Sequence, residues 1–150
     1  MRVEREVVLP VPPPAAWAGL TDWERQPEWM HDADRVRVIS PQRVGVGTTV
    51  AVRTRVLGVP LFTERLEVVG WDPPRELRIA HRSLIRGAGV WSLEPAGTGT
   101  RFRWTEEIAL PVPLLGELAL RGYRPVMRRL MGGAMRDLQA WVLLPERSPG

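Results

Sequence analysis

Three ionisable side chains occupy the expected inward faces of strand-like segments, where each continues an alternating series of apolar residues. They are Glu64 in segment 61–71, His81 in segment 77–82 and Glu106 in segment 101–110. Burial raises the pKa of a carboxyl group, and a nearby histidine can exchange a proton with it, so the three are candidate acid or base catalysts. The alternative is structural: they pair with one another or with arginine, or lie at the wet rim of the sheet.

The run His31-Asp32-Ala33-Asp34 superficially resembles a set of metal ligands. His31 and His81 are the only histidines of the chain, there is no cysteine, and zinc sites usually need three or four ligands. We therefore expect a solvated loop here, no metal site and no cofactor.

The basic residues of the chain are all arginine, since the sequence contains no lysine. This excludes Schiff-base chemistry on a lysine amine. In the strand-like runs the arginines recur at alternate positions, as in Arg53, Arg55, Arg101 and Arg103. That spacing is typical of a solvated sheet face rather than a concentrated basic patch, so we predict no nucleic-acid partner.

The length and composition fit one ordinary globular domain over residues 1–150, with a frayed tail from about residue 145. Hydrophobic residues make up 44% of the chain and charged residues 25%, with no apolar run long enough to span a membrane. Residues 1–6 lack the apolar stretch of a secretory signal, and the chain has no disulfide framework. We expect a cytoplasmic protein; the sequence leaves its oligomeric state open.

Alternating hydrophobicity predicts seven strands, and a helical period predicts one long helix near the end of the chain. Two short helices follow the first strand, one through Trp17 to Leu20 and one containing Trp23 and Glu24 that Pro27 should limit. The expected strands are 3–9, 36–40, 48–57, 61–71, 77–82, 87–94 and 101–110. The long helix is expected over 113–143, kinked or broken at Pro125.

One helix cannot cover the whole inner face of a curled seven-stranded sheet, so a space should remain between them, either filled by side chains or open to a ligand. Met127, Met131 and Met135 recur on the long helix and form either ordinary core or an adaptable wall. The aromatic residues on the inward register are either core or ligand platforms. The predicted ligand contacts are Trp29, Met30, Thr54, Phe62, Trp91, Trp104, Tyr123, Met127, Met131 and Met135.

Several short motifs, in order along the chain, resemble the START-like (SRPBCC) superfamily and most closely its polyketide cyclase/dehydrase-like branch. They are Val11-Pro12-Pro13-Pro14-Ala15-Ala16-Trp17, Leu20-Thr21-Asp22-Trp23-Glu24-Arg25, Glu28-Trp29, Gly45-Val46-Gly47-Thr48, Trp71-Asp72-Pro73-Pro74-Arg75, Trp91-Ser92-Leu93-Glu94-Pro95 and Gly99-Thr100-Arg101. The resemblance implies an α+β helix-grip fold: a curved seven-stranded antiparallel sheet wrapped around the C-terminal helix, with a hydrophobic cavity between. It implies functions from lipid carriage to polyketide cyclisation, and it carries over no catalytic residue.

Three functional hypotheses follow, and the interior of the fold should distinguish them. The first is a carrier or sensor that binds a lipid, isoprenoid or polyketide-like aromatic, favoured by a cavity without clustered titratable groups. The second is a polyketide cyclase or dehydratase that uses Glu64, His81 or Glu106, favoured by a histidine and a glutamate within hydrogen-bond distance inside the cavity. The third is a non-catalytic interaction module, favoured by a filled interior.

Overall fold

The computed structural model describes residues 1–144, which fold into seven strands, two α-helices and one short 3-10 helix. In chain order the elements are β1 (Arg2–Leu9), α1 (Pro13–Leu20), the 3-10 helix η1 (Trp23–Glu28), β2 (Ala33–Val38), β3 (Thr49–Val56), β4 (Val59–Asp72), β5 (Glu76–Arg82), β6 (Arg86–Ala96), β7 (Gly99–Ala109) and α2 (Pro113–Trp141). The predicted frayed tail lies outside the described residues.

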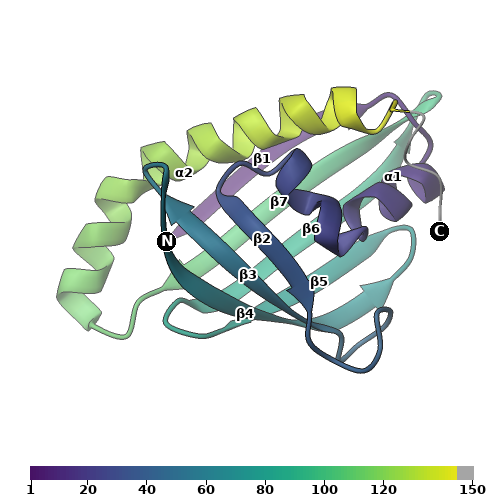
Figure 1. The fold of residues 1–150 in the computed structure, drawn as a ribbon. Coiled ribbons are helices and arrows are strands. Elements are labelled where there is room, and N and C mark those ends of the chain that lie inside the picture. The colour runs from purple at the N-terminus through teal and green to yellow at the C-terminus, as the bar shows by residue number, and fades with distance from the viewer. Residues whose placement is uncertain (145–150) are drawn as a thin grey trace.

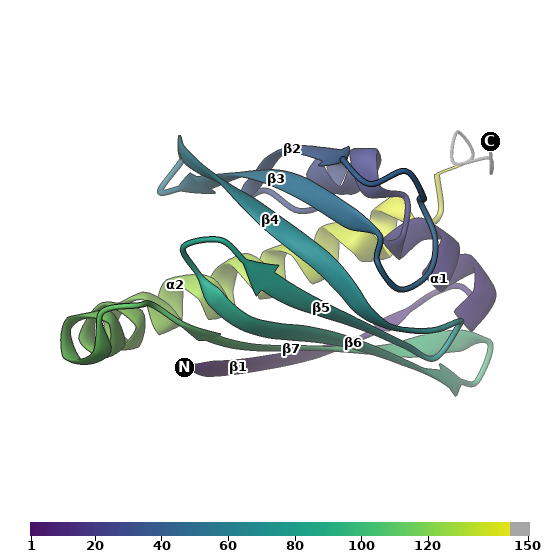
Figure 2. The same ribbon diagram turned by 90° about the horizontal axis from the view of Figure 1, so that it is seen from below.

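The strands form one antiparallel sheet in the order β1-β7-β6-β5-β4-β3-β2. The first strand therefore pairs with the last, and β2 forms the opposite edge. The sheet curls around α2, which lies along its concave face (Figure 1). Viewed from below, β2 and β3 lie on one side of the helix and β1 on the other (Figure 2). This arrangement is the helix-grip fold, and it confirms the predicted fold class.

The alternating pattern of the strands divides a buried inner face from a charged outer face. In β3, Val50 and Val52 are buried while Arg53 is exposed. In β7, Phe102 and Trp104 are buried between exposed arginines. Successive side chains of a strand point to opposite faces of the sheet. When one face packs on the core, alternate residues are therefore buried and the residues between them are exposed.

The helix α2 continues as a single helix through Pro125 and bends in its N-terminal part (Figure 1). Proline removes one backbone donor and crowds the preceding turn, which accounts for a bend without a break. Beyond the bend, Met135, Leu138 and Trp141 are buried against the sheet and the short helices. No helix among residues 1–144 is long and apolar enough to cross a membrane.

Most element boundaries differ by a few residues from the sequence predictions, including those of β2, η1 and α2. The second strand begins at Ala33 rather than at Val36, because its ladder with β3 includes a register shift that breaks the alternation. Pro27 lies inside η1 and does not end it. The last helix ends at Trp141 rather than at Leu143.

Candidate functional site

A cavity of about 380 Å³ lies between the inner face of the sheet and α2. Its wall is mainly apolar and comes from η1, from strands β2 to β7 and from α2. Val50, Val52 and Ile79 contribute from the sheet, and Leu120 and Leu130 from the helix. Cavities of this size hold small ligands in many proteins.

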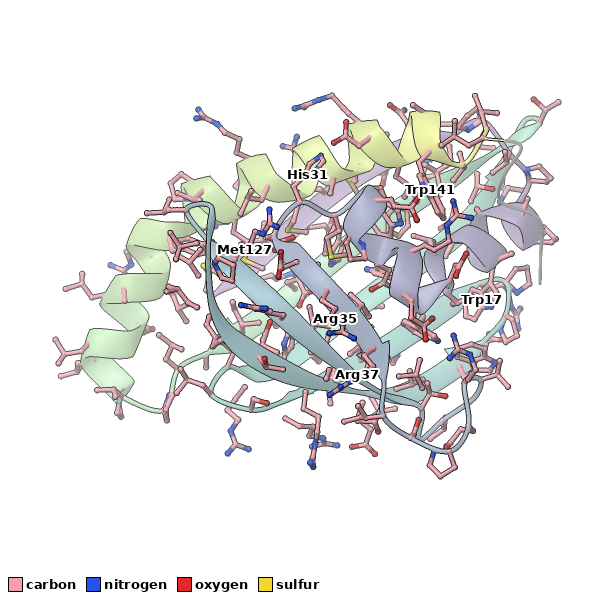
Figure 3. All side chains as sticks on the ribbon, in the orientation of Figure 1. Trp17, His31, Arg35, Arg37, Met127 and Trp141 are labelled. Carbon is pink, nitrogen blue, oxygen red and sulfur yellow. The ribbon has the colours of Figure 1, made fainter. Side chains whose placement is uncertain are left out.

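Eight of the ten predicted ligand contacts line this cavity: Met30, Thr54, Phe62, Trp91, Trp104, Tyr123, Met127 and Met131. Figure 3 shows Met127 on the side of α2 that faces the sheet. The position of these side chains is thus known, while their contact with a ligand stays a prediction.

Trp29 and Met135 do not belong to the cavity wall, which corrects their predicted place there. Trp29 is fully buried, with its ring 6.2 Å from that of Trp91, and Met135 is only 2% exposed within the core. The helical period places Met127, Met131 and Met135 on one stripe, but the cavity ends before the last of them. Met135 therefore has the ordinary core role that the sequence left as its alternative.

The three candidate acid–base residues meet inside the cavity. The Nδ1 atom of His81 lies 3.2 Å from Oε1 of Glu64, and its Nε2 atom lies 2.9 Å from Oε2 of Glu106. All three side chains are 11% exposed. The remaining carboxylate oxygens also accept hydrogen bonds, from the Thr54 hydroxyl at 3.1 Å and from the Trp104 indole at 2.8 Å.

The contact between His81 and Glu106 spans a strand, because β6 lies between β5 and β7. Across this gap β6 presents Gly87 opposite His81 and Gly89 opposite Glu106. A Cβ atom on Gly89 would lie 2.7 Å from Oε1 of Glu106. The missing side chain at Gly89 therefore leaves the room in which the carboxylate reaches the imidazole, a role that sequence analysis did not foresee.

The two glutamates hold His81 in its charged form. Burial by itself disfavours the imidazolium, but the hydrogen bonds to Glu106 and Glu64 outweigh it and raise the pKa of His81 to about 10. Both ring nitrogens are therefore protonated at neutral pH, and each donates to a carboxylate. We call Glu64, His81 and Glu106 the Glu–His–Glu cluster.

Asp32 is a further ionisable group of the cavity wall, and sequence analysis placed it in a solvated loop. Burial raises its pKa to about 6, and the negative charges of Glu64 and Glu106 act in the same direction. Tyr123 lies on the same wall, and burial, together with the charge of Asp32, raises its pKa. Asp32 directly precedes β2, whose first residues contain a register shift. The sequence there does not alternate regularly, so it could not indicate that the Asp32 side chain lies on the cavity wall.

His31 and Asp34 lie outside the cavity wall, so the side chains from His31 to Asp34 do not converge on one site. His31 is exposed and pairs with Asp137 of α2. Asp34 forms ion pairs with Arg55 and Arg53. Within residues 1–144 no group of three or more His, Cys, Asp or Glu side chains is arranged to hold a metal ion.

The N-terminal end of α2 and the tips of two hairpins lie at the same end of the molecule (Figure 2). Each contributes to the cavity wall, with Val56 at the β3–β4 tip, Leu84 and Ile85 at the β5–β6 tip and Ala119 on α2. Exposed apolar side chains continue outward from these segments: Leu57, Val59, Leu61, Leu84, Leu114, Leu115 and Leu118. The cavity is therefore bordered at this end by apolar surface.

A curled antiparallel sheet that encloses an apolar cavity against a long C-terminal helix defines a START-like, helix-grip protein. A family model described as "Polyketide cyclase / dehydrase and lipid transport" matches residues 1–142. The chain belongs to this family. The resemblance seen in the sequence motifs is thereby confirmed, and no curated protein matches the chain.

Solved structures with the same fold are only distantly related in sequence. A protein from Thermus thermophilus is 22% identical, with a TM-score of 0.79 over 95% of this chain and 97% of that one. The ZhuI aromatase/cyclase from Streptomyces sp. R1128 is 15% identical, with a TM-score of 0.78 over 95% and 93%. A START superfamily protein from Mycobacterium smegmatis is also 15% identical, with a TM-score of 0.66 over 94% and 96%. At these identities the likeness is one of fold.

Proposed function

We propose that this chain binds a hydrophobic small molecule in the cavity between the sheet and α2. The observation that carries the proposal is the cavity of about 380 Å³ with a mainly apolar wall. Trp91 and Trp104 border this volume without filling it, which argues against an interaction module with a filled interior. The description of the family, which includes lipid transport, agrees with this function.

The wall also offers the ligand a polar attachment point. Both glutamates of the Glu–His–Glu cluster line the cavity, and each carboxylate oxygen has a second lone pair beyond the hydrogen bond described above. A few fixed polar groups in an apolar pocket orient a ligand, while the apolar wall supplies most of the free energy of binding.

A neutral hydrophobic dye tests the proposal. N-phenyl-1-naphthylamine fluoresces more strongly in apolar surroundings, so its titration reports entry into the cavity. We expect saturable binding by the wild type and at least about tenfold weaker binding by Met131→Trp, whose indole would occupy ligand space. Arg129→Trp places the same indole on the exposed face of α2 and should bind as the wild type does. No saturable binding by the wild type, or equal binding by both variants, would contradict the proposal.

A second candidate is a cyclase or dehydratase that acts on a polyketide-like substrate. It is favoured by the contact of His81 with two glutamates inside the cavity, the feature that we expected of an enzyme. Because both nitrogens of His81 are protonated, the base would be a carboxylate: Glu64, Glu106 or Asp32. It would remove a proton from a carbon next to a carbonyl, the C–H electron pair would form the enolate double bond, and the carbonyl π pair would move to oxygen.

Deuterium exchange tests this second candidate without knowledge of the natural substrate. 2-Acetonaphthone in heavy water exchanges its methyl protons when a bound base removes them, and NMR records the loss of the methyl signal. Exchange above the buffer rate that decreases in Glu64→Gln, Glu106→Gln or Asp32→Asn would support catalysis. Binding of the ketone without such exchange would leave the carrier function as the better account.

A further inference from the structure

The charged groups of the cavity wall are unbalanced. Among the described residues that line it, three carry a carboxyl group (Asp32, Glu64 and Glu106), one carries an imidazole (His81), and none is an arginine. The Glu–His–Glu cluster therefore holds two carboxyl groups against one imidazole. Asp32, whose pKa is about 6, adds a third carboxyl group, which is negatively charged at neutral pH.

The rest of the molecule has the opposite character. The chain has a formal net charge of +4 and all 21 of its basic residues are arginines. Arg35 and Arg37 on β2 point outward (Figure 3), and Arg53 and Arg55 on β3 are exposed and paired with Asp34. A basic exterior thus surrounds an acidic interior, and the charges of the interior are less screened by salt than those of the surface.

The hydrogen-bond donors that contact Glu64 and Glu106 are already engaged. Both N–H groups of His81, the indole N–H of Trp104 and the hydroxyl of Thr54 point to the carboxylates of the Glu–His–Glu cluster. What this cluster presents to a ligand is therefore acceptor oxygens. A carboxylate ligand would meet like charge without a free donor there, whereas an ammonium group would meet acceptors of opposite charge.

We propose that the cavity selects hydrophobic molecules that carry a basic amine, and that it excludes carboxylates such as free fatty acids. The amine lies against Asp32 and the Glu–His–Glu cluster, and the hydrophobic body lies among Phe62, Trp91, Met127 and Met131. This proposal rests on the proposed function, because it assigns a ligand class to the same cavity.

A matched series of three probes tests it: 1-naphthylmethylamine, 1-naphthalenemethanol and 1-naphthoate. They share one ring system and differ in a cationic, neutral or anionic substituent. Isothermal titration calorimetry at neutral pH should show the amine binding at least about tenfold more tightly than the acid, with the alcohol between them. Met131→Trp should weaken the amine and the alcohol alike, which locates both in the cavity.

Asp32→Asn isolates the charge. It should lower the ratio of amine affinity to alcohol affinity at least about threefold, because the ammonium group loses one carboxylate partner while the ring keeps its contacts. Asp34→Asn makes the same change two residues away, outside the cavity, and should leave this ratio unaltered.

The outcomes separate the two proposals. Binding of all three probes with equal affinity, preference for the acid, or an amine-to-alcohol ratio that Asp32→Asn does not change would overturn the charge selection and leave the proposed function intact. Failure of all three to bind would overturn the proposed function, and the charge selection with it.

Discussion

Gly89 of β6 and Glu106 of β7 are paired on neighbouring strands, and a Cβ atom on the glycine would lie 2.7 Å from Oε1 of the glutamate. The absence of one side chain thus allows a carboxylate on β7 to meet an imidazole on β5. The missing side chain at Gly89 on the inner face of the sheet thus makes room for a polar cluster in an apolar cavity.

Gly89→Ala should displace the Glu106 carboxylate and weaken its hydrogen bond to His81. Because this bond helps to raise the pKa of His81 to about 10, the pKa of His81 should fall in the variant. NMR titration of the imidazole signals measures the change. Gly122→Ala is the control, since a Cβ atom at this helical position meets nothing within 4 Å. An unchanged His81 titration in Gly89→Ala would show that Gly89 does not set the position of Glu106.

The stability of the fold should decrease between pH 6.5 and about 10 through His81. Its pKa rises from an ordinary 6.5 to about 10 in the folded protein, so the folded state holds this proton more tightly than the unfolded state. The resulting stabilisation is complete below the lower pKa and is lost as the pH rises through the higher one, by at most about 1.4 kcal/mol per pH unit.

Urea denaturation at several pH values in this interval measures the free energy of unfolding. His81→Gln should remove this part of the decline, whereas His31→Gln, at the exposed histidine, should retain it. Identical pH dependence in His81→Gln and the wild type would show that the cluster does not bind the proton as proposed.

Asp32→Asn should stabilise the protein above pH 6. Burial and the neighbouring glutamates raise the pKa of Asp32 from 3.8 to about 6, so its ionisation costs the folded state free energy. The contribution to stability is present below pH 3.8 and is lost as the pH rises through about 6; a neutral amide avoids the loss. We expect a gain of about 1–3 kcal/mol at neutral pH and a smaller gain in acid, measured by urea denaturation.

Asp34→Asn serves as the comparison, because this carboxylate pairs with Arg55 and Arg53. It should be neutral or slightly destabilising, as expected when a surface ion pair is lost. Destabilisation by Asp32→Asn at neutral pH would mean that the carboxylate has a structural partner and is not held for a ligand.

Two methionines one helical turn apart should respond differently to the same enlargement. Met131 lines the cavity, so Met131→Trp should cost less than about 1 kcal/mol of stability, since the larger ring extends into enclosed space. Met135 lies in the core away from the cavity, so Met135→Trp should cost about 1–3 kcal/mol. Thermal unfolding of both variants makes the comparison, and equal destabilisation would show that the space beside Met131 is not available to a side chain.

The sequence determined the fold class and much of the cavity wall. Alternation in the strands placed Glu64, His81, Trp104 and Glu106 on the inner face, because successive side chains of a strand point in opposite directions. The helical period placed Met127 and Met131 on the face of α2 toward the sheet.

Tertiary structure decided which inward residues meet and which of them border open space. Periodicity separates an inner from an outer face, but it does not say where along a face the packing leaves a cavity, so Trp29 and Met135 were wrongly placed in its wall. Asp32 was not predicted as a cavity residue, because the register shift at the start of β2 interrupts the alternation of inward and outward side chains. The contact between His81 and Glu106 depends on the strand order and on the absence of a side chain at Gly89. These three residues belong to three different strands, which come together only when the sheet forms.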